Sequence, residues 1–164
     1  MNKLFLFFCL LISNFIFAQK PLPSINIFDI NGNVFNTDSI KNENKPIIIS
    51  FWATWCKPCL QELNAISDLY DEWEEMTGVK LYAISIDDQR TSATVSSFVK
   101  GKNWPFIILK DPNHDLKRLL GVNNIPHNFI LDKNRDIVWI HTGYSIGSEE
   151  EIIEKVKQLL QNDF

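Results

Sequence analysis

The feature that most constrains the fold is a pair of cysteines between an apolar run and an amphipathic segment. The run Ile47–Ala53 is almost wholly apolar on both faces, which is typical of a central β-strand covered by helices. From Leu60 onward, apolar residues recur at helical spacing, and Gly78 is well placed to end that helix. Cys56 and Cys59 therefore lie where a buried strand passes into a long helix.

A cysteine at a helix N-terminus has unusual chemistry. The unpaired N–H groups there carry about half a positive charge, which stabilises a thiolate. The thiolate is the form that attacks a disulfide, so we predict that Cys56, just before the helix and accessible, is the nucleophile. Cys59, one turn inside the helix and more buried, is suited to resolve the mixed disulfide. Lys57 adds a cation, and Pro58 suits the first helical turn, where its missing N–H costs little.

The first residues have the pattern of a secretory signal peptide. Asn2-Lys3 forms a small positive region, Leu4–Phe17 is almost uninterruptedly apolar, and Ala18-Gln19 places a small residue before a polar break. A run of about 14 apolar residues is too short to span a bilayer comfortably, so cleavage near Ala18 is favoured over an uncleaved membrane anchor. We expect a signal peptide over residues 1–18 and a periplasmic or otherwise secreted mature protein.

Cleavage would leave the two cysteines as an isolated pair. The chain has three cysteines, and Cys9 would leave with the signal peptide. The loop between Cys56 and Cys59 is too small to restrict much of the unfolded chain, so the pair serves chemistry or a metal rather than a structural disulfide.

A metal site is the alternative use of the cysteines. Zinc needs four ligands, and the sequence has no second Cys-x-x-Cys motif. Its histidines are His114, His127 and His141. A copper site that includes His127 near the dithiol is the remaining alternative. We predict that no metal and no cofactor is bound.

Length and charge limit the remaining classes. With 164 residues, 45 % of them hydrophobic, the chain can bury one sizeable core and is too short for two comfortable domains. The formal net charge is −4 and there is no basic tract, which excludes nucleic acid as a partner. We expect one domain over residues 21–164, with no membrane contact after signal cleavage.

The rest of the chain alternates predicted strands and helices. An Asn31-Gly32 turn within residues 25–35 predicts a hairpin in which both turn positions take positive φ. Asp87-Asp88 is expected in a surface turn, and Ser148 with Glu151 is the capping-box signature of a closing helix. We also expect strands over residues 79–86, 106–109, 129–131 and 137–140 and helices over residues 92–102 and 116–120. This order predicts an α/β fold with a mixed central sheet and helices on both faces.

The combined pattern resembles the thioredoxin fold. The motif Trp-Cys-x-Pro-Cys after an apolar strand, the later Ile125-Pro126 dipeptide, the hairpin after it and the last amphipathic helix carry the resemblance. The N-terminal hairpin and the inserted strand–helix material at residues 87–120 are similar to the secreted TlpA/ResA-like branch. The resemblance covers residues 21–164.

The resemblance implies a buried functional glutamate at Glu62, three residues after Cys59. Its carboxyl would raise the thiol pKa and relay protons when the disulfide is reduced. An exposed glutamate in the first helical turn is the alternative. Thioredoxins carry a buried aspartate where this chain has Ser50, which leaves Glu62 as the nearby acid.

The resemblance also implies a substrate ledge at a cis Ile125-Pro126 bond. In the family this loop lies against the dithiol, and the backbone of the residue before the proline, here Ile125, pairs with substrate. An ordinary trans turn is the alternative. His127 departs from the usual small hydroxyl residue, and it either perturbs the thiolate or merely begins a strand.

The implied activity is thiol–disulfide exchange with proteins. Trp55, together with Trp52, would shield the dithiol and form an apolar docking surface, and Lys57-Pro58 would tune the redox potential toward reduction. Partners would be protein disulfides, with apocytochrome c as the family-typical substrate, and a membrane thiol electron donor. The alternatives are a thiol peroxidase of related fold, with a lone cysteine in a different loop, and a non-catalytic binding module.

Overall fold

The computed structural model describes residues 20–162. The predicted signal peptide, Cys9 and the end of the predicted domain at Phe164 lie outside the described residues. Within residues 20–162, no helix combines the length and the apolar character needed to cross a membrane.

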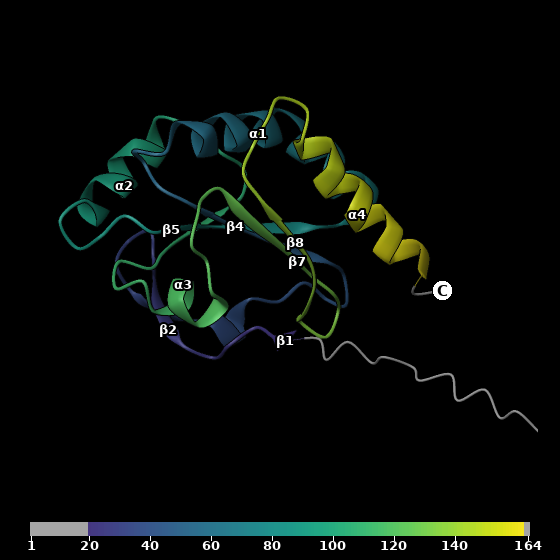
Figure 1. The fold of residues 1–164 in the computed structure, drawn as a ribbon, viewed down its shortest axis with the longest axis horizontal. Coiled ribbons are helices and arrows are strands. Elements are labelled where there is room, and N and C mark those ends of the chain that lie inside the picture. Colours follow the sequence, from purple (N-terminus) through teal and green to yellow (C-terminus); the bar gives the residue numbers. More distant parts are fainter. Residues whose placement is uncertain (1–19, 163–164) are drawn as a thin grey trace, which may run out of the picture.

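The described chain forms one mixed β-sheet with helices on both faces (Figure 1), which confirms the predicted α/β architecture. The strands are β1 (Lys20–Pro21), β2 (Asn26–Asp29), β3 (Val34–Asn36), β4 (Ile47–Trp52), β5 (Lys80–Ser85), β6 (Ile107–Lys110), β7 (His127–Leu131) and β8 (Asp136–Thr142). The helices are the 3-10 turn η1 (Thr37–Ser39) and the α-helices α1 (Lys57–Thr77), α2 (Ser92–Lys100), α3 (Asp115–Leu120) and α4 (Glu149–Asn162).

The strand order is β1-β8-β7-β4-β5-β6-β2-β3, so β4 lies in the middle of the sheet. It pairs in parallel with β5 and antiparallel with β7, and all six of its residues are buried. Figure 1 shows α1, α2 and α4 on one face of the sheet and α3 on the other. A strand covered on both faces needs apolar side chains on both, which explains the continuous apolar run in its sequence.

Helix α1 forms where the sequence predicts it. Cys56 is its N-cap, and Gly78 ends it in the left-handed conformation with φ of 65°. One stripe of its side chains is buried against the sheet and α4. The stripe comprises Cys59, Glu62, Leu63, Ile66, Tyr70, Trp73 and Thr77.

Two local predictions differ from the structure. The β2–β3 hairpin is present, but within its turn only Gly32 has positive φ. The Gly32 N–H donates to the Asp29 carbonyl, so the two central turn residues are Ile30 and Asn31, and Gly32 follows them. The prediction of a capping box is wrong. The Ser148 hydroxyl donates to the Ser145 carbonyl and accepts from the Ser145 N–H, and Glu151 Oε2 lies 3.7 Å from His141 Nδ1.

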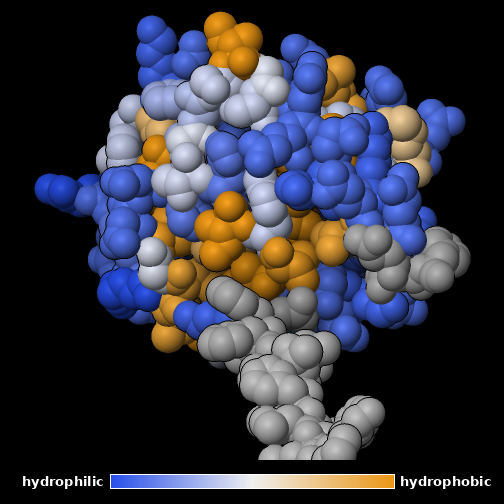
Figure 2. Space-filling view, turned by 45° about the vertical axis from the view of Figure 1, so that its right-hand side comes forward, coloured by the Kyte–Doolittle hydropathy of each residue, from blue (hydrophilic) through white to orange (hydrophobic). Residues whose placement is uncertain are grey.

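The outer surface is mainly hydrophilic on the face turned forward in Figure 2, with one apolar patch in its lower part. Most of the large apolar side chains are in the core, and the exposed ones include Ile140 and Leu119. Single exposed apolar residues of this kind are normal on a folded chain.

The inward stripe of α1 should carry most of the energy that holds this helix. Leu63 is fully buried, whereas Leu69 on the same helix is 36 % exposed. We expect Leu63→Ala to lower the free energy of unfolding by about 2–5 kcal/mol, because it removes buried contacts and leaves a cavity. Leu69→Ala is the matched control and should cost less than about 1 kcal/mol. Urea unfolding of the oxidised protein measures both, and equal costs would contradict the assigned faces.

Candidate active site

The dithiol lies in the loop that joins the buried end of β4 to the start of α1. Cys56 and Cys59 are joined by a disulfide. The Cys56 sulfur accepts a hydrogen bond from the Cys59 N–H at 3.3 Å, and the Cys56 N–H donates to the Ala53 carbonyl at 3.1 Å. The sulfur of Cys56 therefore already takes a free N–H donor of the helix terminus, as a thiolate there would.

The two sulfurs differ in burial. In the disulfide form Cys56 is 6 % exposed and Cys59 is fully buried. Cys56 is thus less accessible than the sequence predicts, although it remains the more exposed of the pair. Lys57, Pro58 and Trp55 beside it are exposed, with Trp55 at 64 %. An incoming chain would meet Cys56 before Cys59.

Glu62 is buried one helical turn beyond Cys59. Its side chain is fully covered, so the alternative of an exposed glutamate is wrong. Asn128 in β7 donates from Nδ2 to Glu62 Oε1 at 2.7 Å. Burial raises the pKa of Glu62 to about 8; the Asn128 donor opposes this rise, and the nearby Glu149 charge adds to it. The carboxyl is therefore protonated at neutral pH.

The Ile125–Pro126 segment leads into β7, and its peptide bond is cis. His127 lies opposite Phe51 in the sheet register, so the residues just before it lie beside the end of β4, where the dithiol loop begins. Pro126 is buried, and its carbonyl accepts from the Gly143 N–H at 2.8 Å. The register therefore brings the predicted substrate ledge to the same end of the sheet as the cysteines.

His127 points away from the Glu62 side of the sheet. It shares a face with Phe51 and packs on Phe129, with ring centroids 4.6 Å apart. Its Nδ1 lies 2.8 Å from the Thr142 hydroxyl, and burial lowers its pKa. Within residues 20–162, no cluster of three His, Cys, Asp or Glu side chains is arranged to hold a metal.

The two tryptophans have different environments. Trp52 is fully buried and packs edge-on against Trp104, with ring centroids 5.1 Å apart. The predicted docking role of Trp52 is therefore wrong, because its position in a central strand covered on both faces leaves it no access to solvent. Of these two tryptophans, Trp55 is the one that presents an exposed aromatic surface next to Cys56.

A buried carboxylate that the sequence does not reveal anchors the dithiol loop. Asp87 is fully buried, so its predicted place in a surface turn is wrong, whereas Asp88 beside it bonds Arg90 at the surface. The Asp87 carboxylate accepts from the N–H of Thr54 at 2.9 Å, from its hydroxyl at 2.5 Å and from the Ser85 hydroxyl at 2.8 Å. An aspartate after a strand is ordinarily a turn residue, so only the tertiary contact with Thr54 identifies its role.

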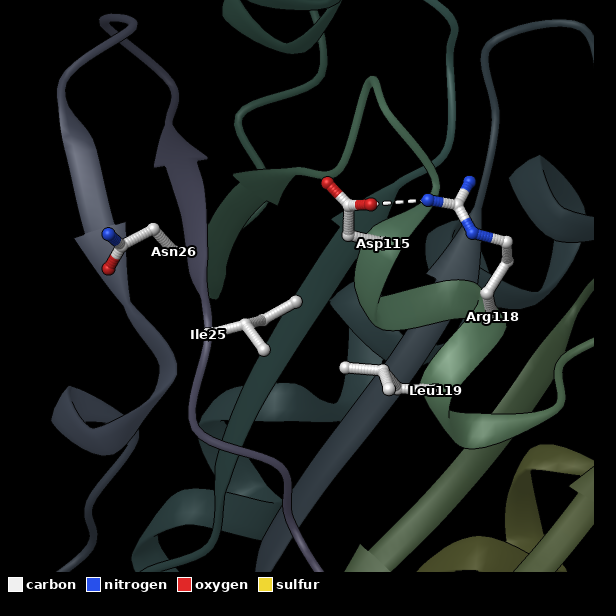
Figure 3. Close-up of a pocket in the computed structure, with 5 residues that line it drawn as sticks. All are labelled: Ile25, Asn26, Asp115, Arg118 and Leu119. Carbon is white, nitrogen blue, oxygen red and sulfur yellow. Dashed lines mark hydrogen bonds and ion pairs between the residues drawn. The ribbon is translucent and has the colours of Figure 1, made fainter.

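A separate cavity of about 500 Å³ lies between α3 and the segment that enters β2 (Figure 3). Asp115 and Arg118 form an ion pair at its rim, and Ile25 and Leu119 line its apolar wall. Its lining includes neither cysteine nor Glu62.

Comparisons with known proteins agree with this geometry. Residues 18–140 match the model of the AhpC/TSA family. A thiol-disulfide oxidoreductase ResA of Bacillus thuringiensis is 28 % identical over 84 % of this chain and 77 % of its own length. The solution structure of an uncharacterized thioredoxin-like protein from Porphyromonas gingivalis is 43 % identical, with a TM-score of 0.77 over 87 % of this chain and 94 % of that one.

A further solved structure, StoA from Bacillus subtilis, is 25 % identical with a TM-score of 0.64 over 81 % of this chain and 96 % of that one. The fold, the position of the Cys-x-x-Cys pair at the start of α1 and the family match lead to one assignment. The chain belongs to the AhpC/TSA family within the thioredoxin superfamily.

Proposed function

We propose that the chain is a protein thiol–disulfide oxidoreductase that works through Cys56 and Cys59. The observation that carries the proposal is the Cys56–Cys59 disulfide at the N-terminus of α1, one turn from a buried, protonated carboxyl. Oxidoreductases of this name are among the relatives of the chain, which supports the same activity. The proposal also gives Trp55, Ile125 and Pro126 the role of contacting the substrate. Lys57 and Pro58 would tune the redox potential of the cysteines.

In the reducing direction the exchange has two steps. The Cys56 thiolate attacks a substrate disulfide, a Cys56–substrate disulfide forms, and the substrate's other sulfur leaves as a thiolate. The Cys59 sulfur, once deprotonated, then attacks Cys56, which releases the second substrate sulfur and closes the Cys56–Cys59 disulfide. Two electrons pass from the dithiol to the substrate. The helix N-terminus stabilises the thiolate that begins the cycle.

Glu62 supplies and accepts the proton that Cys59 needs. Residues three apart on a helix are neighbours on one face, so the Glu62 carboxyl lies one turn beneath Cys59. Because its pKa is about 8, it holds a proton at neutral pH and can pass it to a sulfur that leaves as an anion. When the disulfide forms again, the carboxylate takes the proton back.

The predicted signal peptide supports a proposal for the compartment and the partners of the reaction. We place the mature domain, residues 21–164, in the periplasm or another secreted compartment after removal of the signal peptide at residues 1–18. An oxidising compartment would reoxidise a free dithiol, so a reductant there needs a membrane thiol donor. Protein disulfides, with apocytochrome c among them, are the proposed substrates, and the exposed Trp55 is the proposed apolar contact.

Trapping tests the exchange. In Cys59→Ser the second step cannot occur, so we expect mixed disulfides on Cys56 that dithiothreitol releases and mass spectrometry identifies. The double variant Cys56→Ser with Cys59→Ser is the matched control and should trap nothing. If Cys59→Ser traps no protein, exchange through Cys56 is excluded. Peroxide consumption by Cys59→Ser at the parent rate would instead support the thiol peroxidase, and full biological activity of Cys56→Ser would support the binding module.

The protonated state of Glu62 should make stability depend on pH. The folded protein binds this proton with a pKa of about 8, against 4.5 for an ordinary glutamate, so the native state holds it more tightly than the unfolded state. As the pH rises from 4.5 to 8, the parent should lose stability relative to Glu62→Gln by up to about 1.4 kcal/mol for each pH unit.

Denaturant unfolding of the oxidised protein between pH 5 and pH 9 measures this difference. Glu72→Gln removes an exposed glutamate from the same helix and is the matched control for the loss of one carboxyl group. Parallel stability curves for the parent and Glu62→Gln would show that Glu62 ionises normally in the folded protein.

A further inference from the structure

Unpaired polar atoms gather in the core beneath the dithiol. In the described part of the chain, Ser50 Oγ, Glu62 Oε2 and Asn128 Oδ1 are buried without a hydrogen-bond partner. Ser50 and Asn128 lie directly opposite each other in β4 and β7, so their side chains share the face of the sheet that α1 covers. Unpaired polar atoms are rare in protein interiors, so this group requires an explanation.

Two of these atoms belong to side chains that are already bonded to each other. Asn128 Nδ2 donates to Glu62 Oε1 at 2.7 Å, which leaves Glu62 Oε2 and Asn128 Oδ1 as the second atom of each planar group. A primary amide offers one N–H and one carbonyl oxygen side by side. A carboxyl in its acid form offers the complementary carbonyl oxygen and O–H.

We propose that Glu62 and Asn128 form a two-point pair, in which the acid proton on Glu62 Oε2 donates to Asn128 Oδ1. One proton then satisfies both unpaired atoms, whereas a carboxylate could satisfy neither. Asn128 is on this account a positioning residue: it holds the proton of Glu62 in a fixed direction until the sulfur chemistry takes it. This deepens the role proposed above for Glu62 and rests on it for its meaning in catalysis.

Loss of the proton would be costly at this position. Glu62 Oε2 and Asn128 Oδ1 would then be two acceptors with no donor between them, in a region without access to solvent. The bond from Nδ2 to Oε1 would strengthen on ionisation, but it would be the only one left. The Asn128 N–H donor by itself lowers the pKa of Glu62, whereas the second bond of the pair exists only in the acid form and acts in the opposite direction.

Several other ionisable groups lie on the elements around Glu62 and Asn128. Glu149 at the start of α4 raises the pKa of Glu62, and Tyr144 in the preceding loop interacts with both carboxyls. His141 in β8 lies opposite Asn128 in the register and 3.7 Å from Glu151. Cys56 and Cys59 do not titrate while they form a disulfide. A titration of the oxidised protein therefore reports Glu62 without interference from the thiols.

The test is a carbon-13 NMR titration of the glutamate carboxyls in the oxidised protein, with the Glu62 signal identified by its absence in Glu62→Gln. The readout is the side-chain carbonyl carbon of Asn128, which should shift with the same midpoint as Glu62, because the bond from the acid proton to Asn128 Oδ1 is lost on ionisation. Ser50→Ala, which removes the third unpaired atom but neither bond, is the control and should leave the midpoint within a few tenths of a unit. An Asn128 carbonyl signal that stays constant while Glu62 titrates would overturn the proposal.

The Glu62→Gln variant supplies the matched comparison. In Glu62→Gln the new amide can donate to Asn128 Oδ1, so the Asn128 side-chain carbonyl should keep its bonded carbon-13 shift at every pH. In the parent that shift should change with the titration of Glu62. An Asn128 carbonyl signal that does not follow Glu62 would refute the pair. Neither measurement involves exchange with a substrate, so their failure is distinct from failure of the trapping experiment.

Discussion

Burial of β4 is the constraint on which the rest of the structure depends. All six residues of this strand are buried, with β5 on one side and β7 on the other. Because the strand is fixed along its length, the loop after it begins at a defined point, and Cys56 can serve as the N-cap of α1. The same register brings Pro126 and Asn128 alongside. The positions of both cysteines, the acid and the proline loop thus follow from one strand.

The proposed mechanism separates electron transfer at the sulfurs from proton storage at Glu62. The sulfurs lie at the helix terminus, where backbone dipoles favour an anion, while the carboxyl lies one turn deeper, where burial disfavours one. Two groups one helical turn apart therefore have opposite charge preferences. In the proposed mechanism this difference keeps Glu62 as a neutral acid one turn from the sulfur that becomes a thiolate.

Much of this arrangement can be predicted from the sequence, because strand periodicity, helix end signals and the Cys-x-x-Cys motif are local patterns. The order of elements and the redox-active pair follow from them. The predictions that Trp52 and Asp87 lie at the surface are wrong, because the burial of both side chains depends on tertiary contacts. Phe98 and Trp104 pack against Trp52, and the Thr54 N–H donates to the Asp87 carboxylate. Asn128 carries no sequence signal at all, since an asparagine within a strand gains meaning only from the acid that faces it across the core.

Asp87 holds the start of the dithiol loop through contacts that are independent of the disulfide. Its three accepted hydrogen bonds come from Thr54 and Ser85, and none involves a sulfur. The Cys56–Cys59 bond takes part in none of these three hydrogen bonds. The contacts that hold the start of this loop are thus separate from the bond that changes in the reaction.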